Sequence, residues 1–458
     1  MALSLPSFSP ESQVDAIKSS LTHIADEMDL QLTVRLWNGE VVPLGKNVSP
    51  NLEVVLSDPG VIGSLIRRPT AENLLNLYAT GKIDLSGGNL IEFREAVRMP
   101  GSSRQRIKSL SKGLLLRNAI PFLFAKTNGE EKTEDQTVFQ ADEVGRAESK
   151  RNNKDYIQFH YDVGNDFYKL FLDKEMQYSC GYFTHPDNSL EQAQLDKMEM
   201  ICRKLRLAPG ESMLDIGCGW GGLLCYAAEN FGVKAHGITL SQQQHDLVAE
   251  KIKKRGLTGQ VSVELCDYSK HEGSYDKISS IGMFEHIGVA NYSKYFQHVR
   301  RLLKDRGILL NHAIARSAKR TKKKAKYIRP ERKLLLKYIF PGSELTSAGF
   351  TSDAMEHEGF EVHDTEAWRE HYALTCKAWC ERLTANREEA IKLVGVERYR
   401  LWAAYLAGAS CGFTDGGIKI YQIVASKRVG KGPSGLPLTR ADLYRPATDR
   451  QRDNESAA

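Results

Sequence analysis

Residues 213–222 read MLDIGCGWGG, and this short stretch decides the fold that we expect. Its first half is apolar, which predicts a buried strand, and the glycines predict a tight turn into a helix that begins near Gly221. Glycine suits such a turn because the backbone bends sharply and approaches a ligand, while the first amides of the helix face that ligand. A strand, turn and helix of this kind fit NAD, FAD or S-adenosylmethionine, so the neighbouring segments must decide between them.

Strands and helices alternate along the chain after this loop. The expected strands cover residues 233–239, 261–265, 277–281, 307–314 and 418–425, the last of which should close the sheet. This alternation predicts an α/β fold, a doubly wound Rossmann-like methyltransferase sheet with ligands at the carboxyl ends of its strands.

The end of the second strand argues against a dinucleotide. NAD-binding folds commonly place an acidic residue about 20 residues after the glycines, where it binds a ribose hydroxyl. Here residues 237–244 read GITLSQQQ, which is polar but uncharged. Asp267 instead follows the third strand, a common place for an acidic residue in nucleoside-binding methyltransferases. S-adenosylmethionine is therefore the favoured ligand.

The composition is that of an ordinary soluble protein. The 458 residues suffice for two or three domains, and they are 41% hydrophobic and 26% charged, with a net charge of +6. No apolar run approaches the roughly 18 residues that span a bilayer, and the N-terminus lacks a secretory pattern. The eight cysteines form neither a paired metal-binding pattern nor a disulfide framework. These features predict a cytoplasmic protein with reduced cysteines and no metal site.

Changes in composition divide the chain into four parts. Residues 1–125 are expected to form a smaller, largely helical α+β accessory domain that binds lipid or membrane. The linker over 126–154 is rich in charged and polar residues and should be flexible. Residues 155–427 are expected to form the catalytic domain, and residues 428–458 a disordered tail.

Within the accessory domain, apolar spacing predicts a helix over 11–28 and a strand over 32–37 that turns back at Asn38–Gly39. The segment 103–126 then interleaves Lys and Arg with Leu and ends in an apolar run. A basic helix with a leucine face can lie on an anionic membrane surface. The alternative is a helix that docks on its own domain and exposes a solvated basic face.

Six segments, in one order, carry a family resemblance. They are 160–168 (HYDVGNDFY), 178–183 (YSCGYF), 215–222 (DIGCGWGG), 237–244 (GITLSQQQ), 283–288 (MFEHIG) and 338–342 (YIFPG). With these segments the chain resembles the cyclopropane-fatty-acyl-phospholipid synthase family of S-adenosylmethionine-dependent enzymes. The resemblance implies transfer of a methylene group to the double bond of an unsaturated acyl chain in a membrane phospholipid.

The chemistry of that reaction sets demands on the site. The sulfonium of S-adenosylmethionine is a methyl electrophile, and an alkene that attacks it becomes a carbocation with no lone pair to neutralise it. The site must exclude water, and a base must then remove a proton from the new methyl group so that the ring closes. In the resembled family this base is a bicarbonate ion. The resemblance places its binding groups at the backbone of Cys180 and Ile314 and at the side chains of Glu285, His312 and Tyr372.

The same resemblance implies a set of cofactor-binding residues. They are Tyr178, Ser179, Gly217, Gly219, Thr239, Gln244 and Tyr268, together with Asp215, Leu240 and Ser241 in the same motifs. Asp267 is a more general candidate because it ends the third strand.

Taken singly, the catalytic candidates have simpler interpretations. Cys180 alone would be a buried thiol, and Glu285 with its neighbouring histidine would be a helix cap or a salt bridge at a strand end. His312 would be a core histidine, and Tyr372 a packing residue. Their occurrence together, in the order of the family, favours a functional site.

Three departures from the family pattern leave the product open. Ala315 replaces a usual glycine, residues 343–347 read SELTS where a second glycine and a proline are usual, and residues 316–337 are strongly basic. The alternatives are a methyltransferase that makes a methyl-branched or methylated unsaturated lipid or acts on a soluble acceptor, and a non-catalytic lipid-binding protein.

The basic residues of 316–337 also bear on the partners. A basic run is often a solvated face, and no aromatic platform accompanies this one, so nucleic acid is not expected. The expected partner is unsaturated phospholipid in an anionic membrane, reached by peripheral association with its inner face. The oligomeric state is left open, with a homodimer among the options.

Overall fold

The structure is a computed structural model that describes residues 8–49, 51–98, 107–127, 163–318 and 330–444. The chain forms two compact units, which are treated separately below. The first unit consists of Met1–Gln140, Tyr327–Pro341 and Trp379–Cys411, and the second of Ala141–Lys326, Gly342–Ala378 and Gly412–Ala458. Among the described residues, no helix has the length and apolar character needed to cross a membrane.

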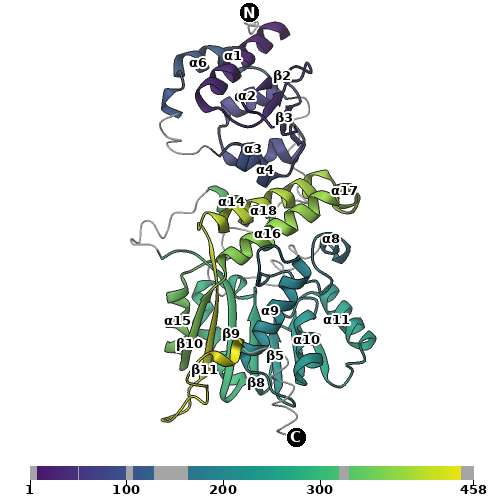
Figure 1. The fold of residues 1–458 in the computed structure, drawn as a ribbon, viewed down its shortest axis with the longest axis vertical. Helices are drawn as coiled ribbons and strands as arrows, with labels where there is room; N and C mark the ends of the chain where they lie inside the picture. Colours follow the sequence, from purple (N-terminus) through teal and green to yellow (C-terminus); the bar gives the residue numbers. More distant parts are fainter. Residues whose placement is uncertain (1–7, 50, 99–106, 128–162, 319–329, 445–458) are drawn as a thin grey trace, which may run out of the picture. The chain divides into compact units, whose positions relative to one another are not determined.

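The second unit contains a sheet with the strand order β10-β11-β9-β8-β5-β6-β7. These strands are β5 (Ser212–Ile216), β6 (Lys234–Thr239), β7 (Val261–Leu265), β8 (Tyr275–Ile281), β9 (Leu303–Ala315), β10 (Phe360–Ala367) and β11 (Lys419–Lys427). Several of these strands are labelled in Figure 1. Strands β7, β6, β5, β8 and β9 run parallel, and β11 pairs antiparallel with both β9 and β10. This confirms the doubly wound, Rossmann-like sheet and places the glycine loop after its central strand.

One strand was missing from the sequence-based expectation. The segment 418–425 does not close the sheet, because β11 lies between β9 and β10. Strand β10 is hard to recognise because it carries Glu361, Asp364 and Glu366 on a half-exposed edge, with only Phe360 fully buried. Charged residues are common on edge strands, where they oppose pairing with another chain.

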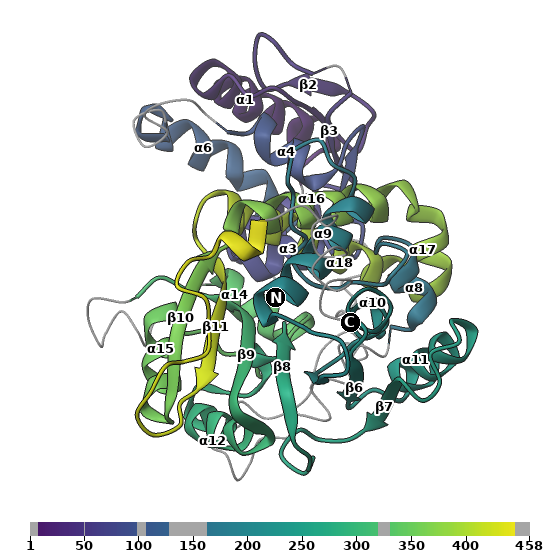
Figure 2. The same cartoon turned by 60° about the horizontal axis from the view of Figure 1, so that its bottom comes forward.

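Helices cover both faces of the sheet (Figure 2). On one face lie α9 (Leu190–Leu205), α10 (Gly222–Phe231) and α11 (Gln242–Lys254), and on the other α12 (Tyr292–Leu302) and α15 (Ala348–His357). Alternate strand residues serve the two layers: Leu310 packs toward the first face and Leu309 toward the second. Shorter elements of this unit are α8 (Asn165–Lys169), η4 (Phe284–His286) and η5 (Val289–Asn291).

The first unit holds a smaller sheet with the order β2-β1-β3-β4. Its elements are α1 (Pro10–Met28), β1 (Thr33–Arg35), β2 (Val41–Pro43), β3 (Glu53–Leu56), α2 (Gly60–Arg67), α3 (Ala71–Ala79), β4 (Ile83–Ser86), α4 (Leu90–Ala96), α6 (Lys112–Ala119) and η1 (Ile120–Phe122). The expected helix over 11–28 and the hairpin at Asn38–Gly39 are both present.

The boundaries of the two units differ from the expected division at residues 125 and 155. Segments from within 155–427 join the first unit. They include α14 (Pro330–Tyr338), α17 (Arg387–Val394), the end of α16 (Arg369–Ala385) and most of α18 (Val396–Thr414). Buried Arg400 of α18 explains this: it donates to the carbonyl of Tyr78 at 2.8 Å and pairs with Asp84 at 3.0 Å. Such long-range contacts leave no trace in local sequence patterns.

Part of the expected tail is folded. Residues 441–444 form η6 (Ala441–Tyr444), where Leu443 is buried and Asp442 pairs with Arg206 at 2.9 Å. Most of the expected linker, residues 128–154, lies outside the described residues, as do 445–458 and the lysine-rich 319–329. Of the described basic residues near 337, Lys337 pairs with Glu72 at 2.5 Å within the first unit.

Candidate active site

The glycine loop after β5 takes the shape that its sequence predicts. Gly217 has φ of +79°, and a Cβ there would lie 2.9 Å from the side chain of Met283, so only glycine fits without a shift. Gly221, at φ +75°, precedes the first residue of α10. From α8, Asn165 accepts a hydrogen bond from the Trp220 indole at 2.8 Å, which fastens part of the segment 160–168 to the loop.

A cavity opens at the carboxyl ends of β5, β6, β7 and β8. It is lined by Tyr178, Ser179, Asp215, Gly217, Gly219, Thr239, Leu240, Gln244, Asp267 and Tyr268. The structure therefore brings together every predicted cofactor residue except Ser241. Ser241 instead caps α11, where its Oγ accepts from the amide of Gln244 at 3.4 Å and its side chain is buried.

Asp215 lines the cavity and also joins two strands. Its carboxylate accepts a hydrogen bond from the Ser279 hydroxyl of β8 at 2.6 Å. Burial raises the pKa of Asp215 to about 6, against the opposing effects of Ser279 and nearby Lys197. Asp215 thus stabilises the sheet at the cavity as well as facing it.

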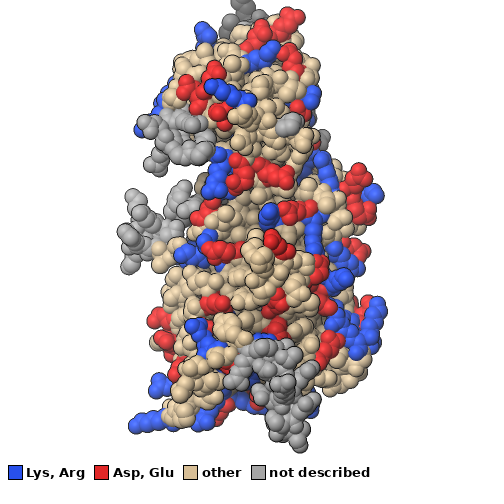
Figure 3. Space-filling view, viewed as in Figure 1, with Lys and Arg blue, Asp and Glu red and all other residues tan. Residues whose placement is uncertain are grey.

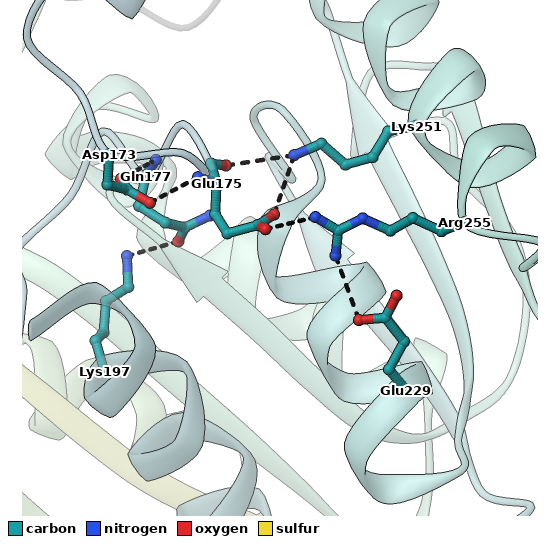
Figure 4. Close-up of polar contacts among 7 residues, drawn as sticks. All are labelled: Asp173, Glu175, Gln177, Lys197, Glu229, Lys251 and Arg255. Atoms are coloured by element: carbon teal, nitrogen blue, oxygen red, sulfur yellow. Dashed lines mark hydrogen bonds and ion pairs between the residues drawn. The ribbon is translucent and has the colours of Figure 1, made fainter. Parts of the chain in front are cut away.

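The segment that carries Tyr178 and Ser179 is held by a polar network (Figure 4). Asp173 accepts from the amides of Glu175 and Gln177, each at 2.8 Å. Glu175 in turn pairs with Lys251 of α11 at 3.3 Å and with Arg255, the residue that caps the C-terminus of that helix. These contacts fix the backbone that leads into the cavity.

A lysine that sequence reasoning missed completes this network. Lys197 of α9 is fully buried, and its ammonium donates to Gln177 at 2.6 Å (Figure 4). It also donates to the Ser179 hydroxyl at 2.9 Å. Burial lowers the pKa of Lys197 to about 8. The sequence signal was a lysine on the helix face shared with Gln194 and Ile201, which are also buried. A charged residue on an otherwise buried face indicates a specific partner.

Glu285 and Ile314 of the catalytic set are in direct contact. The amide of Ile314 in β9 donates to Glu285 Oε1 at 2.6 Å, while Oε2 is buried with no hydrogen-bond partner among the described residues. Burial raises the pKa of Glu285 to about 7, so neutral and ionised forms coexist near neutral pH. An unpartnered buried carboxyl oxygen is costly unless a ligand meets it.

Cys180 and His312 are brought together by Trp368. The Cys180 thiol donates to the Trp368 carbonyl at 3.7 Å, and the His312 ring meets the edge of the Trp368 ring with centroids 5.1 Å apart. Burial raises the pKa of the Cys180 thiol well above its usual value, which excludes a thiolate nucleophile here. The Nε2 of His312 is a second buried atom with no hydrogen-bond partner among the described residues.

Tyr372 stands at the start of α16, one turn after Trp368. Its amide donates to the Trp368 carbonyl at 3.0 Å, and its ring packs on Phe413 at 4.5 Å. The five catalytic candidates are therefore linked through β9 and Trp368. None of them belongs to the cavity lining, but Met283 and His286, which flank Glu285 in sequence, do.

One group of the described residues has metal-ligand chemistry. His236, Glu264 and His271 place one ligand atom each within 4.8 Å of one another. The two imidazoles are stacked, however, with 19° between their planes. Because the lone pair of an imidazole lies in the ring plane, nearly parallel rings do not aim at one point. We assign this group as a hydrogen-bonded cluster, in which His271 Nδ1 lies 3.1 Å from a carboxylate oxygen of Glu264.

Residues 148–423 match the family described as mycolic acid cyclopropane synthetase. The chain belongs to this family. It is 37% identical to a probable fatty acid methyltransferase of Pseudomonas putida over 91% of this chain and 97% of that relative. It is 39% identical to the cyclopropane-fatty-acyl-phospholipid synthase of Escherichia coli K12 over 60% of this chain and 68% of that enzyme.

Solved structures agree with this membership. The crystal structure of mycolic acid cyclopropane synthase CmaA1 complexed with SAH and CTAB has a TM-score of 0.57 and 33% identity, covering 60% of this chain and 99% of that one. The protein is thus an S-adenosylmethionine-dependent methyltransferase of the cyclopropane-synthase type that acts on lipids.

We expect Lys197→Met to weaken S-adenosylmethionine binding by about tenfold while the fold is retained. Ser179 and Gln177 would lose a buried charged donor, and the cofactor segment would lose its anchor on α9. Isothermal titration with circular dichroism measures both effects. Lys277→Met, which removes another buried lysine from the same unit, is the matched control and should bind like the parent. Equal affinity in all three proteins would mean that Lys197 does not position the segment.

Proposed function

We propose that the enzyme adds a methylene group from S-adenosylmethionine to the double bond of an unsaturated acyl chain in a membrane phospholipid, forming a cyclopropane ring. The observation that carries this proposal is a pair of buried atoms with no hydrogen-bond partner among the described residues. They are Oε2 of Glu285, whose other oxygen accepts from Ile314 of β9, and Nε2 of His312 in the same strand. The resemblance of the chain to a cyclopropane-fatty-acyl-phospholipid synthase supports the substrate class.

The residues present fit a small anion such as bicarbonate. Glu285 Oε2 can accept the hydroxyl hydrogen of that ion, and a His312 Nε2–H can donate to one of its oxygens. When bound, bicarbonate would supply the base that takes a proton from the new methyl group. The surrounding side chains of Cys180, His312 and Trp368 are fully buried, which keeps water from the carbocation.

The protonation state of Glu285 matters for this arrangement. Its pKa of about 7 is set mainly by burial, so a large share of the side chains is neutral at neutral pH. A neutral carboxyl avoids repulsion of an anion beside it, and an ionised one can hold the anion's hydroxyl hydrogen. Glu285 can therefore take part in binding the anion in either protonation state.

A second candidate is a methylated or methyl-branched lipid without a ring. The similarity to a probable fatty acid methyltransferase over nearly the whole chain favours it. Residues 343–347, which differ from the family pattern, also favour this second candidate. The amide of Glu344 in this segment donates to the Glu285 carbonyl at 3.0 Å. A change in this segment therefore affects the backbone of the residue that we assign to binding the anion.

For membrane engagement we propose the segment 112–124 of the first unit. Asn118 and Phe122 face inward: Asn118 donates to Ser20 at 3.2 Å, and Phe122 packs on Trp37 with centroids 6.2 Å apart. The side chains of Leu116, Ile120, Leu123 and Phe124 are 70%, 48%, 40% and 54% exposed. Leu114 and Leu115 are only half-exposed, so the outward apolar face begins at Leu116.

This face suits peripheral docking at the inner side of a membrane. Exposed apolar residues beside Lys112 and Arg117 combine insertion with attraction to anionic headgroups. Over the face seen in Figure 3, basic and acidic side chains are interspersed, in keeping with 63 basic and 57 acidic residues in total. Docking therefore depends on a local segment and not on the net charge.

The proposed reaction is tested with labelled S-adenosylmethionine and vesicles of unsaturated phospholipid, followed by mass spectrometry of the fatty acids. We expect a product heavier by one CH2 that no longer contains an alkene. A product that retains the alkene would establish the second candidate. A product that carries no label on the acyl chain would overturn both.

We expect Glu285→Gln to bind S-adenosylmethionine normally and to lose turnover by about tenfold or more. The amide oxygen can still accept from Ile314, which puts an NH2 group where Oε2 was, and that group donates but does not accept hydrogen. In the parent, turnover should also change as the pH rises through about 7, since Glu285 then ionises. The variant should lack that pH dependence, and near-normal turnover in it would remove the assignment.

We expect Leu116→Ser with Phe124→Ser to reduce vesicle binding by about tenfold or more at both low and high salt. Both side chains are exposed in the structure, so their loss removes membrane insertion without creating a cavity. Vesicle co-sedimentation measures the binding. Leu74→Ser with Val97→Ser, two exposed apolar residues elsewhere in the same unit, is the control and should sediment like the parent. If the first variant also sediments like the parent, the segment is not the docking surface.

A further inference from the structure

Two buried polar side chains, Lys204 of α9 and Gln422 of β11, form a hydrogen-bonded chain that ends at His312. Gln422 of β11 lies beside His312 of β9 in the sheet, and its amide nitrogen is 3.1 Å from His312 Nδ1. Both side chains are 0% exposed, so no water competes for this contact. The nature of the contact depends on which end of the Gln422 amide faces the ring.

Lys204 of α9 settles that orientation. Its ammonium donates to the other end of the Gln422 amide at 2.8 Å and pairs with Glu366 of β10. An ammonium has three donors and no acceptor, so the amide oxygen must face Lys204. The NH2 group of Gln422 then faces His312 and donates to Nδ1. A reversed amide would place two donors against each other in a buried site.

We infer that Lys204 and Gln422 are positioning residues that hold His312 as the neutral tautomer with its proton on Nε2. Because Nδ1 accepts from Gln422, the single ring proton must reside on Nε2, the buried atom that has no partner among the described residues. His312 is thereby presented as a donor. The role of this donor toward an anion rests on the proposed function, whereas the tautomer itself does not.

The surroundings oppose the two other states of the ring. Burial, with Lys197 and Lys204 nearby, lowers the pKa of His312 well below its usual value, which disfavours the imidazolium. The Nδ1–H tautomer would point its proton at the NH2 group of Gln422. The Trp368 ring lies against both ends of the chain, 5.3 Å from the Lys204 ammonium and 5.1 Å from the His312 ring, and limits their movement.

An uncharged glutamine between a lysine and a histidine has a specific consequence. A carboxylate at position 422 would accept from both neighbours and would favour the Nδ1–H tautomer or the imidazolium. The amide is instead oriented by Lys204, so its NH2 group faces the His312 ring, and it adds no charge. A neutral Nε2–H beside an anion site donates to the anion and does not compete with it as an acceptor.

The test reads the tautomer directly by NMR of full-length protein labelled with 15N in its histidine rings. The His312 signal is assigned by its absence in His312→Gln. We expect the parent to show His312 only as the neutral Nε2–H form at neutral pH. If His312 of the parent protein is in the Nδ1–H or imidazolium form, the inference is overturned. This measurement does not depend on whether variants of Lys204 or Gln422 fold.

Variants then test the relay, meaning the orientation of His312 by Lys204 through Gln422. Lys204→Met should free the Gln422 amide to turn, giving a mixture of tautomers, whereas Lys277→Met should leave His312 unchanged. We also expect Lys204→Met to raise the bicarbonate concentration needed for half-maximal turnover by about tenfold, with S-adenosylmethionine affinity unchanged. A pure Nε2–H form with unchanged bicarbonate dependence in Lys204→Met would overturn the part assigned to Lys204.

The two proposals fail in different ways. If turnover does not depend on bicarbonate while the parent shows the Nε2–H form, the proposed anion fails and the tautomer assignment stands. If turnover depends on bicarbonate while His312 carries its proton on Nδ1, the relay fails and the anion site stands.

Discussion

The site depends on the burial of two lysines of α9 against the central sheet. Lys197 and Lys204 lie about two helical turns apart on one face, so both point toward the strands. A buried ammonium is tolerated only where acceptors surround it. Lys197 finds them on the segment that leads into the cofactor cavity, and Lys204 finds them on β10 and β11. One helix therefore holds both the segment that leads into the cavity and the polar side chains beside His312.

Much of this could be predicted from local sequence, because the glycine loop and strands such as β7 have strong patterns of their own. The candidate cofactor residues came from the resemblance to a family, apart from Asp267, which followed from its place after the third strand. Of these candidates, only Ser241 does not line the cavity, because its side chain caps a helix. What could not be predicted depends on partners distant in sequence. Edge strand β10 is half-exposed and charged, and Lys204 and Gln422 resemble ordinary polar residues until the fold brings them together.

The division into two units shows the same limit on a larger scale. Residues 379–411 follow the catalytic motifs in sequence, yet they belong to the first unit because Arg400 supplies buried hydrogen bonds to Tyr78 and Ile83. A composition break marks where a chain becomes polar, but a unit is defined by which apolar and polar groups are buried together. The accessory domain thus includes helices that the sequence order assigned to the catalytic one.

In the proposed reaction a sulfonium is attacked by an alkene and a carbocation forms, so the site must also restrain its own nucleophiles. Cys218 lines the cavity. Cys180 contacts Trp368, which also contacts His312. As thiolates they would compete with the alkene for the methyl group. Burial raises the pKa of both thiols well above the usual value, and for Cys218 the nearby Asp215 adds to that effect. The exclusion of water that the proposed carbocation requires therefore also keeps these cysteines unreactive.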